Sequence, residues 1–353
     1  VGKSTLFNAI TKKNILVANY PFATIEPNVG IVTVPDERLT KLEEIYIPEE
    51  LKPATFEFVD IAGIVKGASL GEGLGNKFLS HIREVDAIVE VVRCFDDKEI
   101  THVDGSVDPI RDVEVINLEL ALADLEIINN RIDKIKKKAE TTKEKETVLE
   151  YNALTKAKET LEKDIPLRLA DFTKDELLAI KGFNFLTLKP HIYLANISEN
   201  EITTENDYVK KLKEYAKNEN SKVIVVSAKI ESELAELEDS DKEEMLNELG
   251  IEKSGLDKLI EESYNLLGLK TYFTCGPKEV KAWTYKDGMN AKECAGIIHS
   301  DFEKGFIKAE VISYNDLIEA GSELKVKENG KFRIEGKEYL MQDGDICHFR
   351  FNL

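Results

Sequence analysis

The chain has 353 residues, 42% of them hydrophobic, which is enough for two or three domains with buried cores. Its 48 basic and 67 acidic residues give a net charge of −19, which argues against DNA or RNA binding through overall charge but leaves local basic patches open. No apolar run approaches the length of a membrane span, so we expect no membrane partner. The four cysteines are far apart and never form C-x-x-C, which favours a reducing, cytoplasmic compartment over a disulfide framework or a zinc site.

Five short β-rich runs alternate with helical patterns through the first part of the chain. Several are apolar on both faces, which is typical of a sheet covered by helices on both sides. The alternation predicts a doubly wound α/β domain over residues 1–268. The runs are Val29–Val34, Ala54–Asp60, Ala87–Arg93, His191–Asn196 and Lys222–Ser227.

Residues 117–189 interrupt this alternation. Apolar residues recur every three or four positions from Leu118 to Ile135 and again from Val148 to Ile165, with a polar run between them. This pattern predicts an inserted antiparallel helical hairpin. The segment Arg131–Lys145 has 7 basic and 3 acidic residues. It could bind RNA phosphates by counterion release, or it could be a solvated helix face.

The pattern of apolar and polar residues changes in residues 269–353. Two strand patterns, a helix near Asn290–Ser300 and further strands predict a small α+β domain, a β-grasp sheet around one helix. From Lys270 onward the chain has 13 basic and 14 acidic residues, so the acidity of the protein lies almost wholly in the first 269 residues.

The chain opens with V-G-K-S-T at Val1–Thr5. Gly2, Lys3 and Ser4 match the end of the phosphate-binding pattern G-x-x-x-x-G-K-[ST], in which backbone N–H groups and a helix N-terminus hold phosphates. The match predicts that the first glycine and a strand precede Val1. Alone, these residues are weak evidence, and an ordinary capped helix start is the alternative.

Further fragments follow in the order that a P-loop nucleotidase requires. Asp60 and Gly63 in D-I-A-G follow a strand, where an Asp binds Mg²⁺ through water and a glycine N–H faces the γ-phosphate. Thr24, on a loop before the first strand, would reach Mg²⁺ only when the γ-phosphate draws the loop inward, which makes that loop a switch. Asn196 and Ser227–Lys229 close the last two strands, at the base-binding position. Ligands of doubly wound folds bind at such strand ends.

The base-binding motif departs from that of GTPases. They usually carry N/T-K-x-D, whose Asp accepts both guanine N–H groups, whereas this chain has Ile197 and Glu199 at the Lys and Asp positions. The Asn196 amide can pair with adenine N6 and N7, with Ile197 against the base. We therefore expect ATP, and a GTPase that tolerates Glu is the alternative.

The residue that orients water also differs. Ras-like enzymes place a glutamine after D-x-x-G, and this chain has Ile64, which cannot orient water. His102, on the polar loop T-H-V-D-G, is the best catalytic candidate. A histidine of an ordinary surface loop is the alternative.

Several long segments make the chain similar to a known family. ANYPFATIEPNVG, DIAGIVKGASLGEGLGNKFL and TYFTCGPKEVKAWT closely resemble the YchF/Obg-like ATPase family within the translation-factor P-loop GTPases. The resemblance implies a C-terminal TGS domain, a preference for ATP, a catalytic role for His102, and Ser4 with Thr24 as Mg²⁺ ligands beside Asp60. We expect the nucleotide to contact Val1, Gly2, Lys3, Ser4, Thr5, Gly63, Asn196, Ile197, Glu199, Ser227 and Ala228.

The resemblance also implies a partner, because this family is associated with ribosomes and stress responses. We expect a slow ATPase that acts on or near the ribosome, at the large subunit or the whole 70S or 80S particle and through ribosomal RNA, with no DNA partner. A non-catalytic, nucleotide-gated ribosome-binding module and a GTP-specific GTPase remain as alternatives.

Overall fold

The computed structural model describes residues 2–13, 29–61, 74–96, 105–142 and 144–352, without the side chains of 13 and 74–78. These residues form two compact units. The first contains the described parts of 1–12 and 59–256 together with 29–30, and the second contains residue 13, 31–58 and 257–352. None of the described helices is long and apolar enough to cross a membrane.

The first unit is built from helices around a small sheet. Its helices are α1 (Lys3–Lys13), α3 (Leu74–Glu84), α4 (Pro109–Thr142), α5 (Lys145–Leu161), α6 (Lys174–Ile180), α7 (Asp207–Asn218), α8 (Ala228–Leu234) and α9 (Asp239–Leu249). Its strands are β4 (Ile88–Arg93), β5 (His191–Asn196) and β6 (Lys222–Val226). Single 3₁₀ turns lie at η2 (Leu167–Leu169), η3 (Lys181–Phe183), η4 (Leu186–Leu188) and η5 (Glu199–Glu201).

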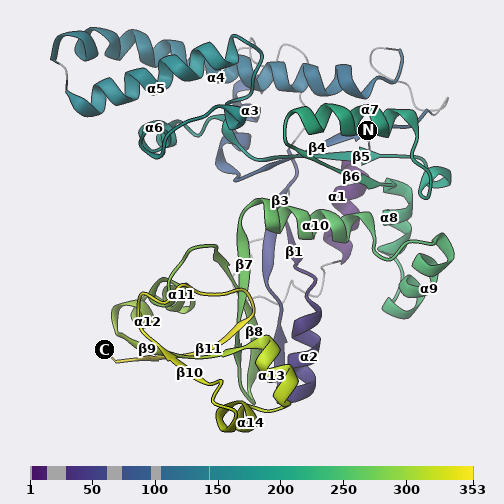
Figure 1. Ribbon diagram of the computed structural model, residues 1–353. Helices are drawn as coiled ribbons and strands as arrows, with labels where there is room; N and C mark the ends of the chain where they lie inside the picture. The colour runs from purple at the N-terminus through teal and green to yellow at the C-terminus, as the bar shows by residue number, and fades with distance from the viewer. Residues whose placement is uncertain (1, 14–28, 62–73, 97–104, 143, 353) are drawn as a thin grey trace. The chain divides into compact units, whose positions relative to one another are not determined.

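Strands β4, β5 and β6 form a parallel sheet in that order. Every residue of the central strand β5 is buried, as expected for a parallel strand covered on both faces. Helices α4 and α7 cover one face, and α7 runs along β5 and β6 in Figure 1. Their shared apolar cluster is Val92, Cys94, Val113, Tyr193, Ala195, Ile197, Val209, Leu212 and Ala216.

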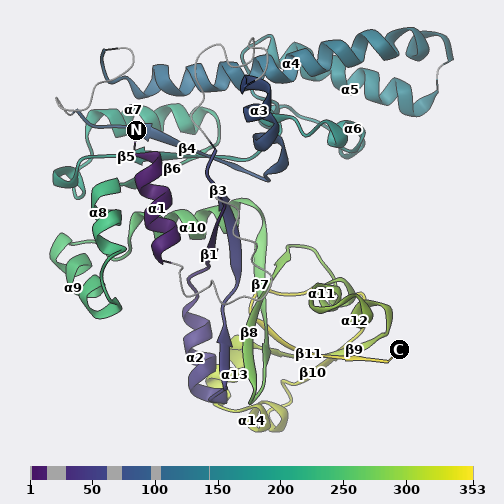
Figure 2. The same cartoon turned by 180° about the vertical axis from the view of Figure 1, so that it is seen from behind.

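The inserted helical hairpin is present as α4 and α5, which lie side by side in both views (Figures 1 and 2). Asp108 accepts hydrogen bonds from the N–H groups of Ile110 and Arg111, and Pro109 occupies the first helical position, where its missing N–H costs nothing. The helix α4 therefore begins at Pro109, before the predicted start of the insertion at residue 117. The hairpin core is Ile128, Ile135, Ala153, Leu154, Ala157, Leu161, Leu167, Ile180 and Phe185.

The second unit and its borders hold the remaining elements. The strands are β1 (Val29–Thr33), β2 (Glu50–Lys52), β3 (Thr55–Val59), β7 (Leu269–Cys275), β8 (Glu279–Lys286), β9 (Phe306–Ser313), β10 (Arg333–Glu335) and β11 (Asp345–Phe351). The helices are α2 (Glu37–Tyr46), α10 (Gly255–Leu266), α11 (Ala291–Ile298), α12 (Ser300–Lys304), α13 (Tyr314–Ala320) and α14 (Glu323–Glu328).

A six-stranded sheet in the order β10-β9-β11-β7-β8-β2 dominates this unit. Helix α11 packs across it beside β8 and β9, which Figure 2 shows from behind, so the predicted β-grasp arrangement is confirmed. Strand β2 adds a parallel edge to β8, and β1 pairs with β3 in a separate two-stranded sheet. The α11 side of the main sheet is filled by Tyr272, Tyr285, Ala291, Cys294, Ala295, Ala309, Val311, Met341, Cys347 and Phe349.

Candidate nucleotide-binding site

The carboxyl ends of the three parallel strands meet at one edge of the first unit. Arg93 of β4 pairs with Asn196 of β5, and Asn196 pairs with Val226 of β6. Backbone hydrogen bonds carry the alignment one residue further, from Cys94 N to Asn196 O and from Ile197 N to Val226 O, both at 2.8 Å. This edge is where open α/β sheets bind their ligands.

Asn196 joins the predicted base motif to the predicted phosphate loop. Its side chain is buried, with 3% of the residue exposed, and its Oδ1 accepts a hydrogen bond of 2.9 Å from the Ala228 N–H. Its Nδ2 lies so close to Gly2 that a Cβ on Gly2 would approach within 2.4 Å. Gly2 also has a φ of +92°, which disfavours any side chain there. The structure thus brings Gly2, Asn196 and Ala228 together.

Helix α1 begins directly after Gly2 and suits a phosphate ligand. The first backbone N–H groups of a helix have no intrahelical partner, and the helix dipole favours an anion beside them. The first turn carries no acidic side chain that would repel an anion, and Ser4 and Thr5 are exposed. This start is held in place by the packing of Gly2 on Asn196.

Lys3 and Asp60 face each other at this helix start. The Lys3 ammonium contacts the Asp60 carboxylate, with 35% and 24% of their side chains exposed. Asp60 follows the end of β3, as predicted. No cluster of three or more His, Cys, Asp or Glu that could hold a metal occurs among the described residues. The donor set of Asp60 and Ser4 fits Mg²⁺, which prefers oxygen and usually keeps waters and phosphate oxygens among its ligands.

Glu199 does not project as an isolated carboxylate. It forms an ion pair with Lys229 at 2.6 Å, and this hydrogen bond raises the pKa of Lys229. The two residues follow the adjacent strands β5 and β6, so the pair lies at the same edge as Asn196. The motif predicted Glu199 at this edge but gave no sign of Lys229 as its partner.

Ile197 and Ser227 are both buried beside Asn196. Ile197 is 3% exposed and belongs to the apolar cluster under α4 and α7, so its predicted contact with a base stays a prediction. Ser227 is 1% exposed, and its Oγ has no hydrogen-bond partner among the described residues. A buried hydroxyl in that state fits a site that is completed by a polar ligand.

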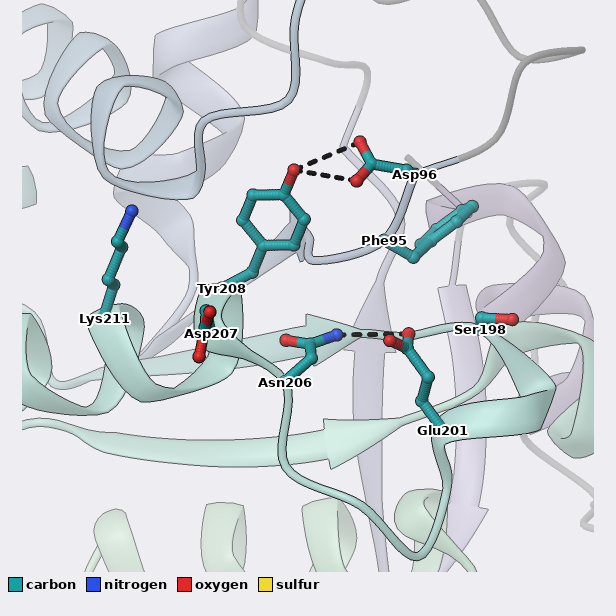
Figure 3. A pocket seen from close by; sticks show the side chains of 8 residues that line it. All are labelled: Phe95, Asp96, Ser198, Glu201, Asn206, Asp207, Tyr208 and Lys211. Carbon is teal, nitrogen blue, oxygen red and sulfur yellow. Dashed lines mark hydrogen bonds between the residues drawn. The ribbon is translucent and has the colours of Figure 1, made fainter.

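A pocket of about 550 Å³ opens beside the motif (Figure 3). The Asn206 side chain holds one wall of the pocket in place. Its Oδ1 caps α7 by accepting a hydrogen bond of 2.9 Å from the Val209 N–H. Its Nδ2 donates to the carbonyl oxygen of Cys94 at 2.8 Å and to Glu201 Oε2 at 3.1 Å. The Tyr208 hydroxyl donates to the Asp96 carboxylate, which raises the Tyr208 pKa. The lining residues are Phe95, Asp96, Ser198, Glu201, Asn206, Asp207, Tyr208 and Lys211.

Sequence reasoning missed this pocket, although Ser198 belongs to the motif N-I-S-E and Phe95 lies two residues after the end of β4. An aromatic residue at such a strand end is a signal that could have found it, because stacking surfaces for bases are aromatic. Of the predicted site residues, Val1, Thr24, Gly63 and His102 lie outside the described residues, as does Ile64.

The helix start, the strand-end motif and the parallel sheet define a P-loop nucleotide-binding protein with a C-terminal β-grasp domain. A family model described as "50S ribosome-binding GTPase" matches residues 1–152, and the YchF-GTPase_C model, described as a protein of unknown function, matches residues 269–352. The chain belongs to the YchF family, as the sequence resemblance predicted.

Similar proteins cover nearly the whole chain. The "Ribosome-binding ATPase YchF" of Bacillus subtilis (strain 168) is 59% identical, and that of Escherichia coli O157:H7 is 50% identical; each match covers 100% of this chain and 97% of the relative. The structure of the Schizosaccharomyces pombe YchF GTPase is 42% identical with a TM-score of 0.90, over 99% of this chain and 95% of that one. The match at this TM-score confirms the predicted fold class.

Proposed function

We propose that this protein is an ATP-binding and ATP-hydrolysing switch that acts on the ribosome in the cytoplasm. The observation that carries the proposal is the packing of Gly2 against Asn196, which brings a phosphate-binding helix start and a base motif to one sheet edge. Relatives at 50–59% identity bear the name "Ribosome-binding ATPase YchF", which supports both the reaction and the partner.

Each part of the site has a role in this reaction. The first-turn N–H groups of α1 and the Lys3 ammonium bind the β- and γ-phosphates, and Gly63 faces the γ-phosphate. Ser4, Thr24 and Asp60 hold Mg²⁺, which neutralises charge on the phosphates when it is bound. Lys3 then exchanges its contact with Asp60 for a phosphate oxygen, because ATP brings negative charge to the helix start.

Base choice follows from the residues around Asn196. Glu199 and Ile197 stand where GTPases carry their guanine-selective Asp and Lys, which favours ATP. The Oδ1 of the buried Asn196 amide accepts from the Ala228 N–H, and a side-chain amide can pair with adenine N6 and N7. The pocket beside Ser198 and Phe95 offers the neighbouring surface on which a base could stack.

Calorimetry on the full-length protein tests base choice. We expect tighter binding of ATP than of GTP, and a Lys3→Ala variant that has lost most of its affinity for both. The double change Ile197→Lys and Glu199→Asp should shift the preference toward GTP by about 1–3 kcal/mol, the value of one bidentate base contact. A parent protein that binds GTP about tenfold more tightly than ATP would show that the site is that of a GTPase.

Catalysis is assigned to His102, because Ile64 stands where Ras-like enzymes carry the glutamine that orients water. Changing His102→Ala should lower the ATP hydrolysis rate by roughly 10²-fold and leave ATP affinity nearly unchanged, as expected when a positioned polar group is lost. Single-turnover hydrolysis gives the rate, and calorimetry gives the affinity. Equal hydrolysis rates in the variant and the parent would mean that His102 is an ordinary surface-loop residue.

A nucleotide-gated binding module is the second candidate, and the apolar Ile64 favours it because slow hydrolysis would only reset the switch. Turnover measured with and without ribosomes separates the two. If ATP hydrolysis drives the function, the turnover rate should be higher in the presence of ribosomes. A binding module should show nucleotide-dependent ribosome affinity with an unchanged, low rate.

A further inference from the structure

The Asn206 side chain uses its two polar groups for different purposes. Its Oδ1 accepts from the Val209 N–H at 2.9 Å and thereby caps α7. Its Nδ2 donates at 2.8 Å to the carbonyl oxygen of Cys94, which follows β4, and at 3.1 Å to Glu201 Oε2. A helix cap requires only the acceptor, so the bond to Cys94 has a purpose beyond capping.

This bond lies where the pairing of β4 with β5 stops. The Cys94 N–H donates to the carbonyl oxygen of Asn196 at 2.8 Å, as in a parallel ladder. If the pairing continued, the Ser198 N–H would donate to the carbonyl oxygen of Cys94. That oxygen accepts from the Asn206 amide, and the chain enters η5 directly after Ser198. Asn206 therefore takes the place of the next strand partner.

The pocket begins at the point where the two strands separate. Phe95 and Ser198, one from each side of the separation, line the pocket together with Asn206 (Figure 3). The buried Arg93 also holds Phe95, because its Nε donates to the Phe95 carbonyl oxygen at 3.1 Å and its guanidinium lies 4.9 Å from the ring centre. Side chains thus fix the chain on the β4 side of the pocket.

We infer that Asn206 is a positioning residue of the nucleotide site, whose amide keeps the ends of β4 and β5 apart and the pocket open for the base. Cys94 is fully buried, and a buried carbonyl oxygen without a partner is costly. Without the Asn206 donor, the Ser198 N–H replaces it, which extends the pairing and narrows the pocket. This inference rests on the proposed ATP-binding function and deepens it by naming the group that shapes the base pocket.

The test compares a non-hydrolysable ATP analogue with the same molecule lacking its base, each with Mg²⁺, on the full-length protein. Calorimetry gives both affinities, and their ratio measures the contribution of the base. Asn206→Ser keeps an N-cap residue but has no amide to reach Cys94, so it should lower the ratio by about tenfold, within the range of one stacked base. Asn206→Asp also caps a helix, and its carboxylate cannot donate, so the ratio should fall at least as far. The affinity for the molecule without a base should change equally little in Asn206→Ser, because the start of α1 holds the phosphates.

Asn290 provides a matched control in the second unit, because its side chain caps α11 by accepting from the Glu293 N–H at 3.0 Å. Asn290→Ser should leave the ratio unchanged. Urea denaturation should give both Asn206 variants nearly the midpoint of the parent, since the cap of α7 remains. An unchanged ratio in either Asn206 variant would overturn the positioning role while the proposed function stands. A parent protein that binds the ATP analogue no more tightly than the molecule without a base would show instead that the base site of the proposed function is wrong.

Discussion

At the scale of single residues, Glu90 of β4 and His191 of β5 form a buried acid–base pair. Only 8% of Glu90 and 2% of His191 is exposed, and the Glu90 Oε2 lies 3.1 Å from the His191 Nε2. Burial raises the pKa of Glu90 well above its usual value and lowers the pKa of His191 to about 3. Both shifts favour neutral groups, so an uncharged carboxyl and an uncharged imidazole share this hydrogen bond.

This pair predicts a pH-dependent effect of Glu90→Gln. Because the folded-state pKa of Glu90 is raised above 4.5, its contribution to stability is present below pH 4.5 and is lost as pH rises toward the folded pKa. The glutamine stays neutral, so the variant should gain stability relative to the parent from about pH 5 upward, by at most about 1.4 kcal/mol per pH unit. His191 titrates in both proteins, and its effect cancels in the difference.

Urea denaturation of both proteins at several pH values between 5 and 8 measures this difference. A gap between the two free energies of unfolding that widens with pH supports a protonated Glu90 in the folded state. A gap that stays constant over this range would mean that Glu90 is ionised there despite its burial.

The sequence placed several candidate residues at strand ends and at a helix start, but it did not reveal the contacts that they make. Lys3, Asp60 and Asn196 could be located because motif spacing ties each to a helix start or a strand end. The pair of Glu199 with Lys229 and the bond from Asn206 to Cys94 could not. These contacts depend on which strands are neighbours in the sheet, and the local sequence pattern does not reveal strand order.

At the scale of elements, α3 is held against helix α4 of the helical hairpin by a buried carboxylate. Asp124 of α4 is fully buried and accepts from Arg83 Nη1 at 3.0 Å, Leu186 N at 3.0 Å and the Thr187 N and Oγ1 at 2.8 Å. The Lys189 ammonium donates to the carbonyl oxygen of Arg83 at 3.1 Å, near the end of α3. One carboxylate therefore joins three segments that are distant in sequence.

We expect Asp124→Ala to be among the most destabilising single changes in the first unit. It leaves the Arg83 guanidinium and two backbone N–H groups without their acceptor, and breaking a buried charge pair costs about 3–5 kcal/mol. Urea denaturation checks this value. Glu150→Ala, which removes the more exposed ion pair with Arg131 at 2.5 Å, should cost under about 1 kcal/mol and serves as the control. Similar losses in the two variants would contradict a special role of Asp124.

Elements with strong periodicity were predicted well, and elements set by distant partners were not. Strand His191–Asn196 was predicted with its observed bounds, because a short apolar run buried on both faces has a clear signal. Helix α4 continues through Ala139 to Thr142, within the run expected to separate the two helices, since its last turns need no apolar stripe. Strand β2 has only three residues and pairs with β8, far along the chain, so no local pattern reveals it.

At the scale of the whole molecule, charge is unevenly distributed along the chain. The first 269 residues carry almost all of the net charge of −19, yet the end of α4 is basic. Lys134, Lys136, Lys137 and Lys138 are exposed there, while Ile135 is buried in the hairpin core. An acidic protein that binds an RNA-rich particle needs such a local patch, because its overall field repels phosphate.

Neutralising these four lysines to glutamine should therefore weaken co-sedimentation with ribosomes and flatten its dependence on salt. Each lost phosphate contact reduces the slope of log affinity against log salt by about 0.7–0.9, so four contacts would change it by about 3. A control variant changes four other exposed lysines of the first unit to glutamine, namely Lys210, Lys213, Lys217 and Lys222. It alters the net charge by the same amount and should keep the slope of the parent protein. If both variants pellet like the parent across the salt series, the end of α4 is a solvated helix face. Residues 270–353, which have 13 basic and 14 acidic residues, then become the part of the chain to test for ribosome binding, because their own net charge repels phosphate little.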